Sequence, residues 1–136
     1  LSLLGEDAVA ALESNTMISP CYLVVVRCER GYLLTRGPNY CETTYVSKYG
    51  HPNPLVQTNI DHDVSNVEED WAADDPLLLN AVERRKCNAS ALSKISKHTV
   101  DEFFEVLQVN PVFNDDTVYS CVMCPSTGIY ETVVYH

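Results

Sequence analysis

Six cysteines are the residues of this chain most capable of chemistry. Side chains of this type can form disulfides, bind zinc or act as catalytic nucleophiles. An even number in 136 residues favours up to three disulfides and an oxidising compartment. Spacing alone does not choose among the possible pairings. The six positions are Cys21, Cys28, Cys41, Cys87, Cys121 and Cys124.

Metal binding and catalysis are weakly supported by the spacing of the candidate ligands. Cys121 and Cys124 form a single C-x-x-C, and zinc sites of this type need a second C-x-x-C or a His-x3-His partner. Asp61-His62-Asp63 could hold a metal, but such a run is more often solvated charge. The chain contains no G-x-S-x-G, P-loop or G-x-G-x-x-G motif. We therefore expect no catalytic residues, no metal and no cofactor, and a protein that is not an enzyme.

The charge balance narrows the class of partner. The formal net charge is −10, from 19 acidic and 9 basic residues. Nucleic acids and anionic lipids would be repelled, whereas a protein with a basic patch would be attracted. No run of 18 apolar residues is present, so a membrane attachment would need a transmembrane segment absent from this sequence. One glycosylation sequon, at Asn88, fits an extracellular or luminal protein.

The segment from residue 21 to 28, C-Y-L-V-V-V-R-C, is the most strongly predicted strand. Successive side chains of a strand point to opposite faces. Arg27 marks one face as the outer one, so we expect Val24, Val26 and Cys28 to point toward the core.

Two segments favour helices. The Ala-rich residues 1–16 predict a short helix, with an N-terminal strand as the alternative. Asp75-Pro76 supplies an N-cap and a proline at the first helical position, which predicts a helix ending near Cys87. Before it, residues 55–75 carry most of the acidic excess and predict a loop-rich insertion, which we place at about 53–87 together with the helix.

The remaining β-prone segments predict further strands. Thr99 to Glu102 matches a capping box and would begin a helix, but we assign a strand to 103–109 because it would precede the next strand across a turn. Pro125-Ser126-Thr127-Gly128 predicts a hairpin turn. The other expected strands are 32–35, 40–49, 89–97 and 129–135.

Residues 115–121 read D-D-T-V-Y-S-C, which resembles the D-T-A-V-Y-Y-C of the F strand in immunoglobulin variable domains. The resemblance implies a mainly β fold, namely a variable-type immunoglobulin-like β-sandwich with a helical and acidic loop insertion. It also implies one domain over residues 1–136. The chain departs from that pattern because Cys121 follows Cys28 by 93 positions (121 − 28 = 93) and no tryptophan lies shortly after Cys28.

The resemblance also implies roles for individual residues. Tyr119 would be the tyrosine corner, supported by Asp115. Cys28 and Cys121 would form the disulfide between the two sheets. Further disulfides would then join members of the remaining set, Cys21, Cys41, Cys87 and Cys124.

A diverged, cysteine-rich domain of this kind is similar to the cytomegalovirus glycoproteins that bind major histocompatibility complex (MHC) class I molecules. The similarity implies a viral immune-evasion ectodomain in the endoplasmic reticulum lumen or at the cell surface, which interferes with recognition by T or NK cells. The alternative is an extracellular immunoglobulin-like adhesion or receptor-decoy domain with another protein ligand.

Either role places the partner-binding residues on exposed loops. The expected contacts lie in the acidic insertion and in the last hairpin turn, while Met123 is expected to pack in the core because it shares a face with Cys121. The candidate contact residues are Asp70, Trp71, Asp74, Pro125, Ser126 and Thr127.

Overall fold

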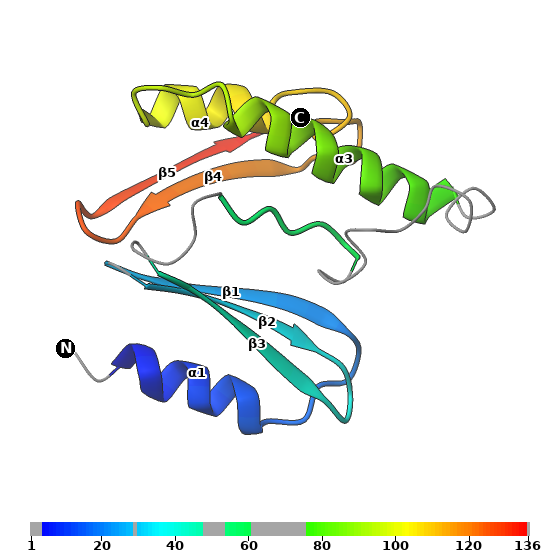
Figure 1. Cartoon of the computed structure of the whole chain (residues 1–136), viewed down its shortest axis with the longest axis vertical. Helices are drawn as coiled ribbons and strands as arrows, with labels where there is room; N and C mark the ends of the chain where they lie inside the picture. Colours follow the sequence, from blue (N-terminus) through cyan, green and yellow to red (C-terminus); the bar gives the residue numbers. More distant parts are fainter. Residues whose placement is uncertain (1–3, 29, 48–53, 61–75, 136) are drawn as a thin grey trace. The chain divides into compact units, whose positions relative to one another are not determined.

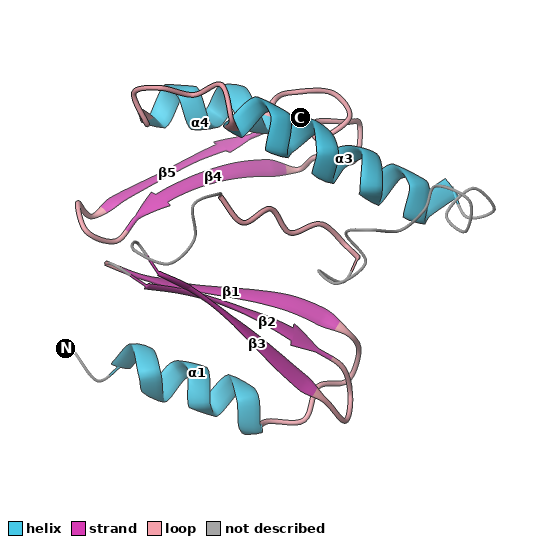
Figure 2. Cartoon of the chain, in the orientation of Figure 1, coloured by secondary structure: helices cyan, strands magenta, loops and turns pink. Residues whose placement is uncertain are grey.

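The computed structural model describes residues 4–28, 30–47, 54–60 and 76–135. These residues form three helices and two antiparallel sheets, one of three strands and one of two, so the fold is mixed rather than mainly β (Figures 1 and 2). The chain divides into two compact units, Leu1–Asn53 and Pro54–His136. One domain over 1–136 therefore stays a prediction.

The first unit is a helix followed by a three-stranded meander. Helix α1 covers Leu4–Ser14, and strands β1 (Cys21–Arg27), β2 (Arg30–Arg36) and β3 (Cys41–Ser47) pair in chain order. The helix expected from the Ala-rich start and the strand expected after Pro20 are both confirmed. Figure 1 shows α1 lying along one face of the sheet.

Arg36 joins α1 to the sheet. Its guanidinium is buried and donates from Nη1 to the Glu13 carbonyl at 3.0 Å and from Nη2 to the Asn15 carbonyl. These carbonyls belong to the C-terminal end of α1, where the last backbone acceptors of a helix have no intrahelical partner. Thr43 adds a hydroxyl bond of 2.6 Å to Glu13 Oε1. The end of the helix is thus held by polar contacts from the sheet.

The expected orientation of β1 is wrong. Val24 and Val26, which we expected in the core, are 63% and 52% exposed, and Cys28 is also exposed. Leu23 is half-buried and pairs with Leu34 of β2, which is fully buried. The reason is that Arg27 did not mark the solvent face: it is half-buried, because a long aliphatic stem can lie along the protein while its charge reaches water.

The second unit packs one helix on a hairpin and a second helix against the first. Helix α3 covers Pro76–Leu92, α4 covers Val100–Leu107, and strands β4 (Tyr119–Cys124) and β5 (Ile129–Val134) form the hairpin. Figure 2 shows both helices on the same side of the two strands. The start of α3 at a proline and the closing strand are confirmed, but α3 continues past Cys87.

A capping box decides the structure of 99–107. Thr99 accepts from the Glu102 amide at 3.3 Å, and the Glu102 carboxylate accepts from the Thr99 amide at 3.3 Å. This reciprocal pair satisfies two backbone donors that a helix start leaves open. The predicted strand over 103–109 is therefore wrong, and so is the outer strand over 89–97, where α3 runs to Leu92.

None of the helices within the described ranges has both the length and the apolar composition that crossing a membrane requires. Of the predicted acidic insertion at about 53–87, the described part is an irregular segment over 54–60 and helix α3.

Candidate functional site

The hairpin β4–β5 has two chemically different faces. Its register pairs Tyr119 with Val134 and Met123 with Tyr130, and directly paired residues lie on the same face of an antiparallel pair. These four side chains form the outer face, and they are 63%, 56%, 61% and 71% exposed respectively. Such exposure of four large apolar groups on two short strands is unusual for a solvated surface.

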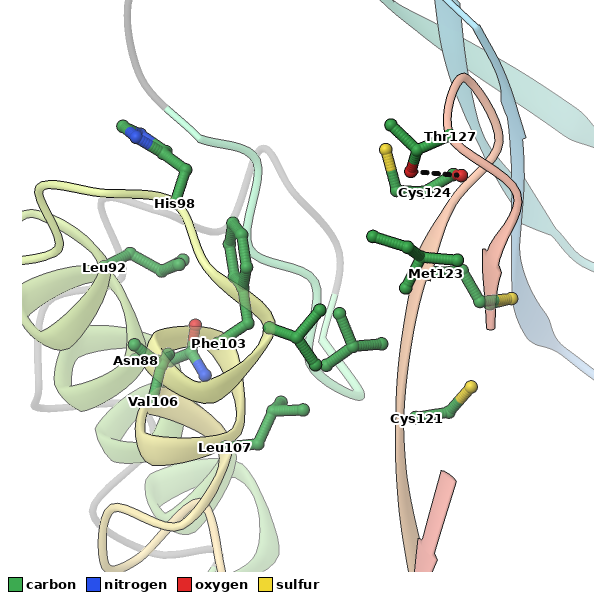
Figure 3. A pocket seen from close by; sticks show the side chains of 13 residues that line it. Asn88, Leu92, His98, Phe103, Val106, Leu107, Cys121, Met123, Cys124 and Thr127 are labelled. Carbon is green, nitrogen blue, oxygen red and sulfur yellow. Dashed lines mark hydrogen bonds between the residues drawn. The ribbon is translucent and has the colours of Figure 1, made fainter. Parts of the chain in front are cut away.

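The inner face of the hairpin packs toward α4. Ser120 is buried there, and Val122 and Cys124 are half-buried. Strand alternation explains the split, since these three residues alternate with Tyr119, Cys121 and Met123. Figure 3 shows the Cys121 and Met123 side chains pointing away from the helices.

The outer face corrects two expectations. Met123 is exposed rather than in the core, although it does share a face with Cys121. Tyr119 is also largely exposed, so its ring does not pack inward as a tyrosine corner would. Tyr135 packs inside this unit instead, with its ring centroid 4.8 Å from that of Phe113 in an edge-on contact.

The loop before β4 is organised by Asn114 rather than by Asp115. Asn114 Oδ1 accepts from the Asp116 amide at 2.9 Å, and the Asn114 carbonyl accepts from the Thr117 amide at 3.0 Å. Asp115 itself is exposed. Asparagine side chains commonly stabilise turns in this way. The turn that leads into β4 is therefore stabilised by Asn114, the residue just before the 115–121 motif.

The predicted hairpin turn is confirmed, and it places a thiol next to two hydroxyls. Thr127 donates to the Cys124 carbonyl from both its amide (3.2 Å) and its hydroxyl (3.3 Å), and Gly128 adopts a positive φ of 74°. Ser126 Oγ lies 3.2 Å from Cys124 Sγ. Hydrogen bonds from the Ser126 and Thr127 hydroxyls lower the pKa of Cys124 to about 7.

The same arrangement limits what the cysteines can do. Three residues along a strand span about 10 Å, whereas a disulfide needs Cα atoms about 4.4–6.8 Å apart. Cys121 and Cys124 therefore cannot form a disulfide with each other or coordinate the same metal ion. The described residues contain no group of three or more His, Cys, Asp or Glu placed to hold a metal.

No disulfide joins any two of the six cysteines, all of which lie in the described part of the chain. The expected bridge between Cys28 and Cys121 is not formed, and the two residues belong to different units. Cys28 lies just beyond the end of β1 and is exposed instead of buried in a core. Nor does a hydrogen bond join His98 to Cys124 among the described residues, so no cysteine–histidine catalytic pair is formed.

Asn88 lies inside helix α3, where it is half-buried and lines a cavity. Glycosylation sites normally lie on surface loops. An oligosaccharide on Asn88 would have to pass through that cavity to reach solvent, which is unfavourable. Glycosylation of Asn88 stays a prediction.

Of the predicted contact residues, the structure brings together those of the hairpin turn, Pro125, Ser126 and Thr127. Those of the acidic insertion, Asp70, Trp71 and Asp74, lie outside the described residues. Sequence reasoning did not identify Tyr130 and Val134 as contact residues, although the β-rich run I-Y-E-T-V-V-Y predicted the strand that carries them.

Comparison of the chain with protein-family models, with curated proteins and with solved structures finds no match.

Proposed function

We propose that this chain is a protein-binding module, not an enzyme, and that the outer face of the β4–β5 hairpin is its contact surface. The observation that carries the proposal is the exposure of Tyr119, Met123, Tyr130 and Val134 on one face. Aromatic residues and methionine are enriched in protein interfaces, and tyrosine is a common hot spot because its ring is large and rigid. The turn residue Thr127 continues the surface at one end.

The partner that the proposal names is a host MHC class I molecule, bound by a viral immune-evasion ectodomain in the endoplasmic reticulum lumen or at the cell surface. Its support is the D-D-T-V-Y-S-C motif, which leads directly into the strand that carries the surface. The net charge of −10 supports a partner with a basic patch. The variable-type sandwich belongs to the same proposal, with two antiparallel sheets in its favour and helix α4 as its departure.

The experiment measures binding of the purified chain to a panel of folded class I molecules by biolayer interferometry. Tyr130→Ala should raise Kd about 30-fold or more, because truncating an interface hot spot costs about 2 kcal/mol. Ile18→Ala is the matched control, since this side chain is fully exposed but lies outside the hairpin. Its Kd should equal that of the unchanged chain.

The outcomes distinguish an error in the proposed contact surface from an error in the proposed partner. Class I binding that Tyr130→Ala leaves unchanged would overturn the hairpin as the contact surface. Absence of binding to every class I molecule would overturn the immune-evasion role and favour a receptor-decoy or adhesion domain. A concentration-dependent dimer in sedimentation, lost in Tyr130→Ala, would show that a second copy covers the face and would overturn the proposal.

A further inference from the structure

A cavity lies on the inner side of the hairpin, opposite the proposed contact surface. Its volume is about 600 Å³, and its wall is formed mainly by apolar side chains of α3, α4, β4 and β5 (Figure 3). That volume falls within the roughly 300–1,000 Å³ of small-molecule sites. It is several times the ~150 Å³ of an engineered apolar cavity that binds benzene. The principal lining residues are Leu92, Phe103, Val106, Leu107, Val122 and Ile129.

The cavity follows from the way α4 meets the hairpin. Val100, Phe103 and Val106 recur at helical spacing and so form an apolar stripe on α4. The hairpin presents Val122 and Cys124 to that stripe, and these side chains are too short to fill the space between strand and helix. A site of this size lined by apolar groups is more favourably filled by an apolar molecule than by water.

Asn88 offers a polar group to a ligand in the cavity. Asn88 of α3 lines the cavity, and its carboxamide forms no hydrogen bond with the described residues. Thr127, at the other end, already donates its hydroxyl to the Cys124 carbonyl. A carboxamide can both donate and accept, so it suits a single hydroxyl or carbonyl group.

The lining contains no Asp, Glu, Lys or Arg. The one histidine of the lining, His98, is exposed, so a charged ligand group deeper in the cavity would lose its hydration without gaining an ionic partner, which is strongly unfavourable. A net charge of −10 on the chain adds repulsion for an anion. The occupant is therefore neutral.

We infer that this cavity binds a neutral, apolar small molecule with one hydroxyl or carbonyl group, which Asn88 hydrogen-bonds. Cys124 lines the same cavity beside the hairpin turn, so a bound molecule covers its thiol. The cavity lies on the inner face of the hairpin and the proposed contact surface on its outer face. Met123 and Thr127 border both, whereas Tyr130, which tests the contact surface, does not line the cavity.

The binding experiment uses the full chain, the neutral dye Nile red and three competitors with the same carbon chain: 1-dodecanol, dodecane and dodecanoate. Dye fluorescence should rise saturably, 1-dodecanol should displace the dye best, and dodecanoate should compete at least tenfold more weakly. Asn88→Leu should remove the preference for 1-dodecanol over dodecane, a factor of about five for one neutral hydrogen bond. Absence of saturable dye binding, or equal competition by dodecanoate, would overturn the inference.

Two further measurements keep the test independent of folding defects. Val122→Phe should fill the cavity and weaken dye binding at least tenfold, whereas Val118→Phe, at an exposed position outside the lining, should not. In the unchanged, reduced chain, saturating 1-dodecanol should slow iodoacetamide modification of Cys124 and leave that of Cys28 unaffected. Equal rates at Cys124 with and without 1-dodecanol would place the ligand elsewhere and overturn the inference.

Discussion

Replacing Ser126 by alanine together with Thr127 by valine should raise the pKa of the Cys124 thiol toward its ordinary value. The Ser126 hydroxyl, 3.2 Å from Sγ, is the largest cause of the lowered pKa, and the Thr127 hydroxyl and amide follow. These groups stabilise the thiolate, since a donor bonded to the charged form lowers its pKa. Removal of the two hydroxyls should raise the midpoint of Cys124 alkylation from about 7 toward 9.0.

The size of the effect follows from two opposing terms. At pH 7 a thiol of pKa near 7 is about half ionised, whereas one of pKa 9.0 is only ~1% ionised, a ratio of about fifty. A less basic thiolate is also a weaker nucleophile, and a Brønsted slope of about 0.45 over two pKa units reduces the rate roughly eightfold. The net expectation is alkylation of Cys124 up to about sixfold faster in the unchanged chain at pH 7, the upper value holding for a full return to pKa 9.0. At pH 10, where both thiols are ionised, the variant should react faster.

The assay follows iodoacetamide modification of the reduced chain by peptide mass spectrometry between pH 5 and 10. Ser93→Ala is the matched control, because this hydroxyl bonds only the nearby Ser90 carbonyl, at 2.8 Å. Its profile should coincide with that of the unchanged chain. A midpoint for Cys124 near 9 in the unchanged chain, or one that the double substitution does not move, would refute the reasoning.

Three further predictions concern stability. Partial desolvation raises the pKa of Glu102, but hydrogen bonds from the Ser96, Thr99, Lys97 and His98 amides outweigh it and lower the pKa below 4.5. The stabilisation that the Glu102 carboxylate gives to α4 is therefore full above pH 4.5 and should be lost as the pH falls through the lowered pKa. Glu102→Gln should remove this acid step from the helical ellipticity measured against pH. Leu34→Ala should lower the free energy of unfolding by about 3 kcal/mol, because a fully buried leucine leaves a cavity, and Val24→Ala, in an exposed position of the same sheet, should change it by less than about 1 kcal/mol. Arg36→Met should lower the free energy of unfolding by about 2 kcal/mol or more in chemical denaturation, since hydrogen bonds from a charged donor to the α1 carbonyls are lost. For each of the three substitutions Glu102→Gln, Leu34→Ala and Arg36→Met, an unchanged midpoint would contradict the contact that the substitution tests.

Local signals determined much of the element order. The Ala-rich start, the Val-rich segment from Cys21, the proline that opens α3 and the turn at 125–128 each act within a few residues, and the structure confirms them. Their physical basis is backbone preference: proline restricts φ, β-branched side chains favour extended backbone, and Gly128 accepts the positive φ of the turn.

The error at 103–109 shows a local signal outweighed by a global pattern. Thr99 and Glu102 announced a helix start, but an immunoglobulin-like order of strands required an extended segment there. The two capping bonds and an apolar stripe at helical spacing agree with each other, and neither depends on distant residues. In this segment the local chemistry was the better guide.

The chain alone determined which residues were available: a cysteine beside two hydroxyls, and strands rich in tyrosine and valine. Tertiary structure decided what they became. Pairing of β4 with β5 placed Met123 against Tyr130 on one face, and packing of α4 against the other face formed the cavity. Alternation along a strand separates two faces but does not say which one is covered, because burial depends on what packs against it.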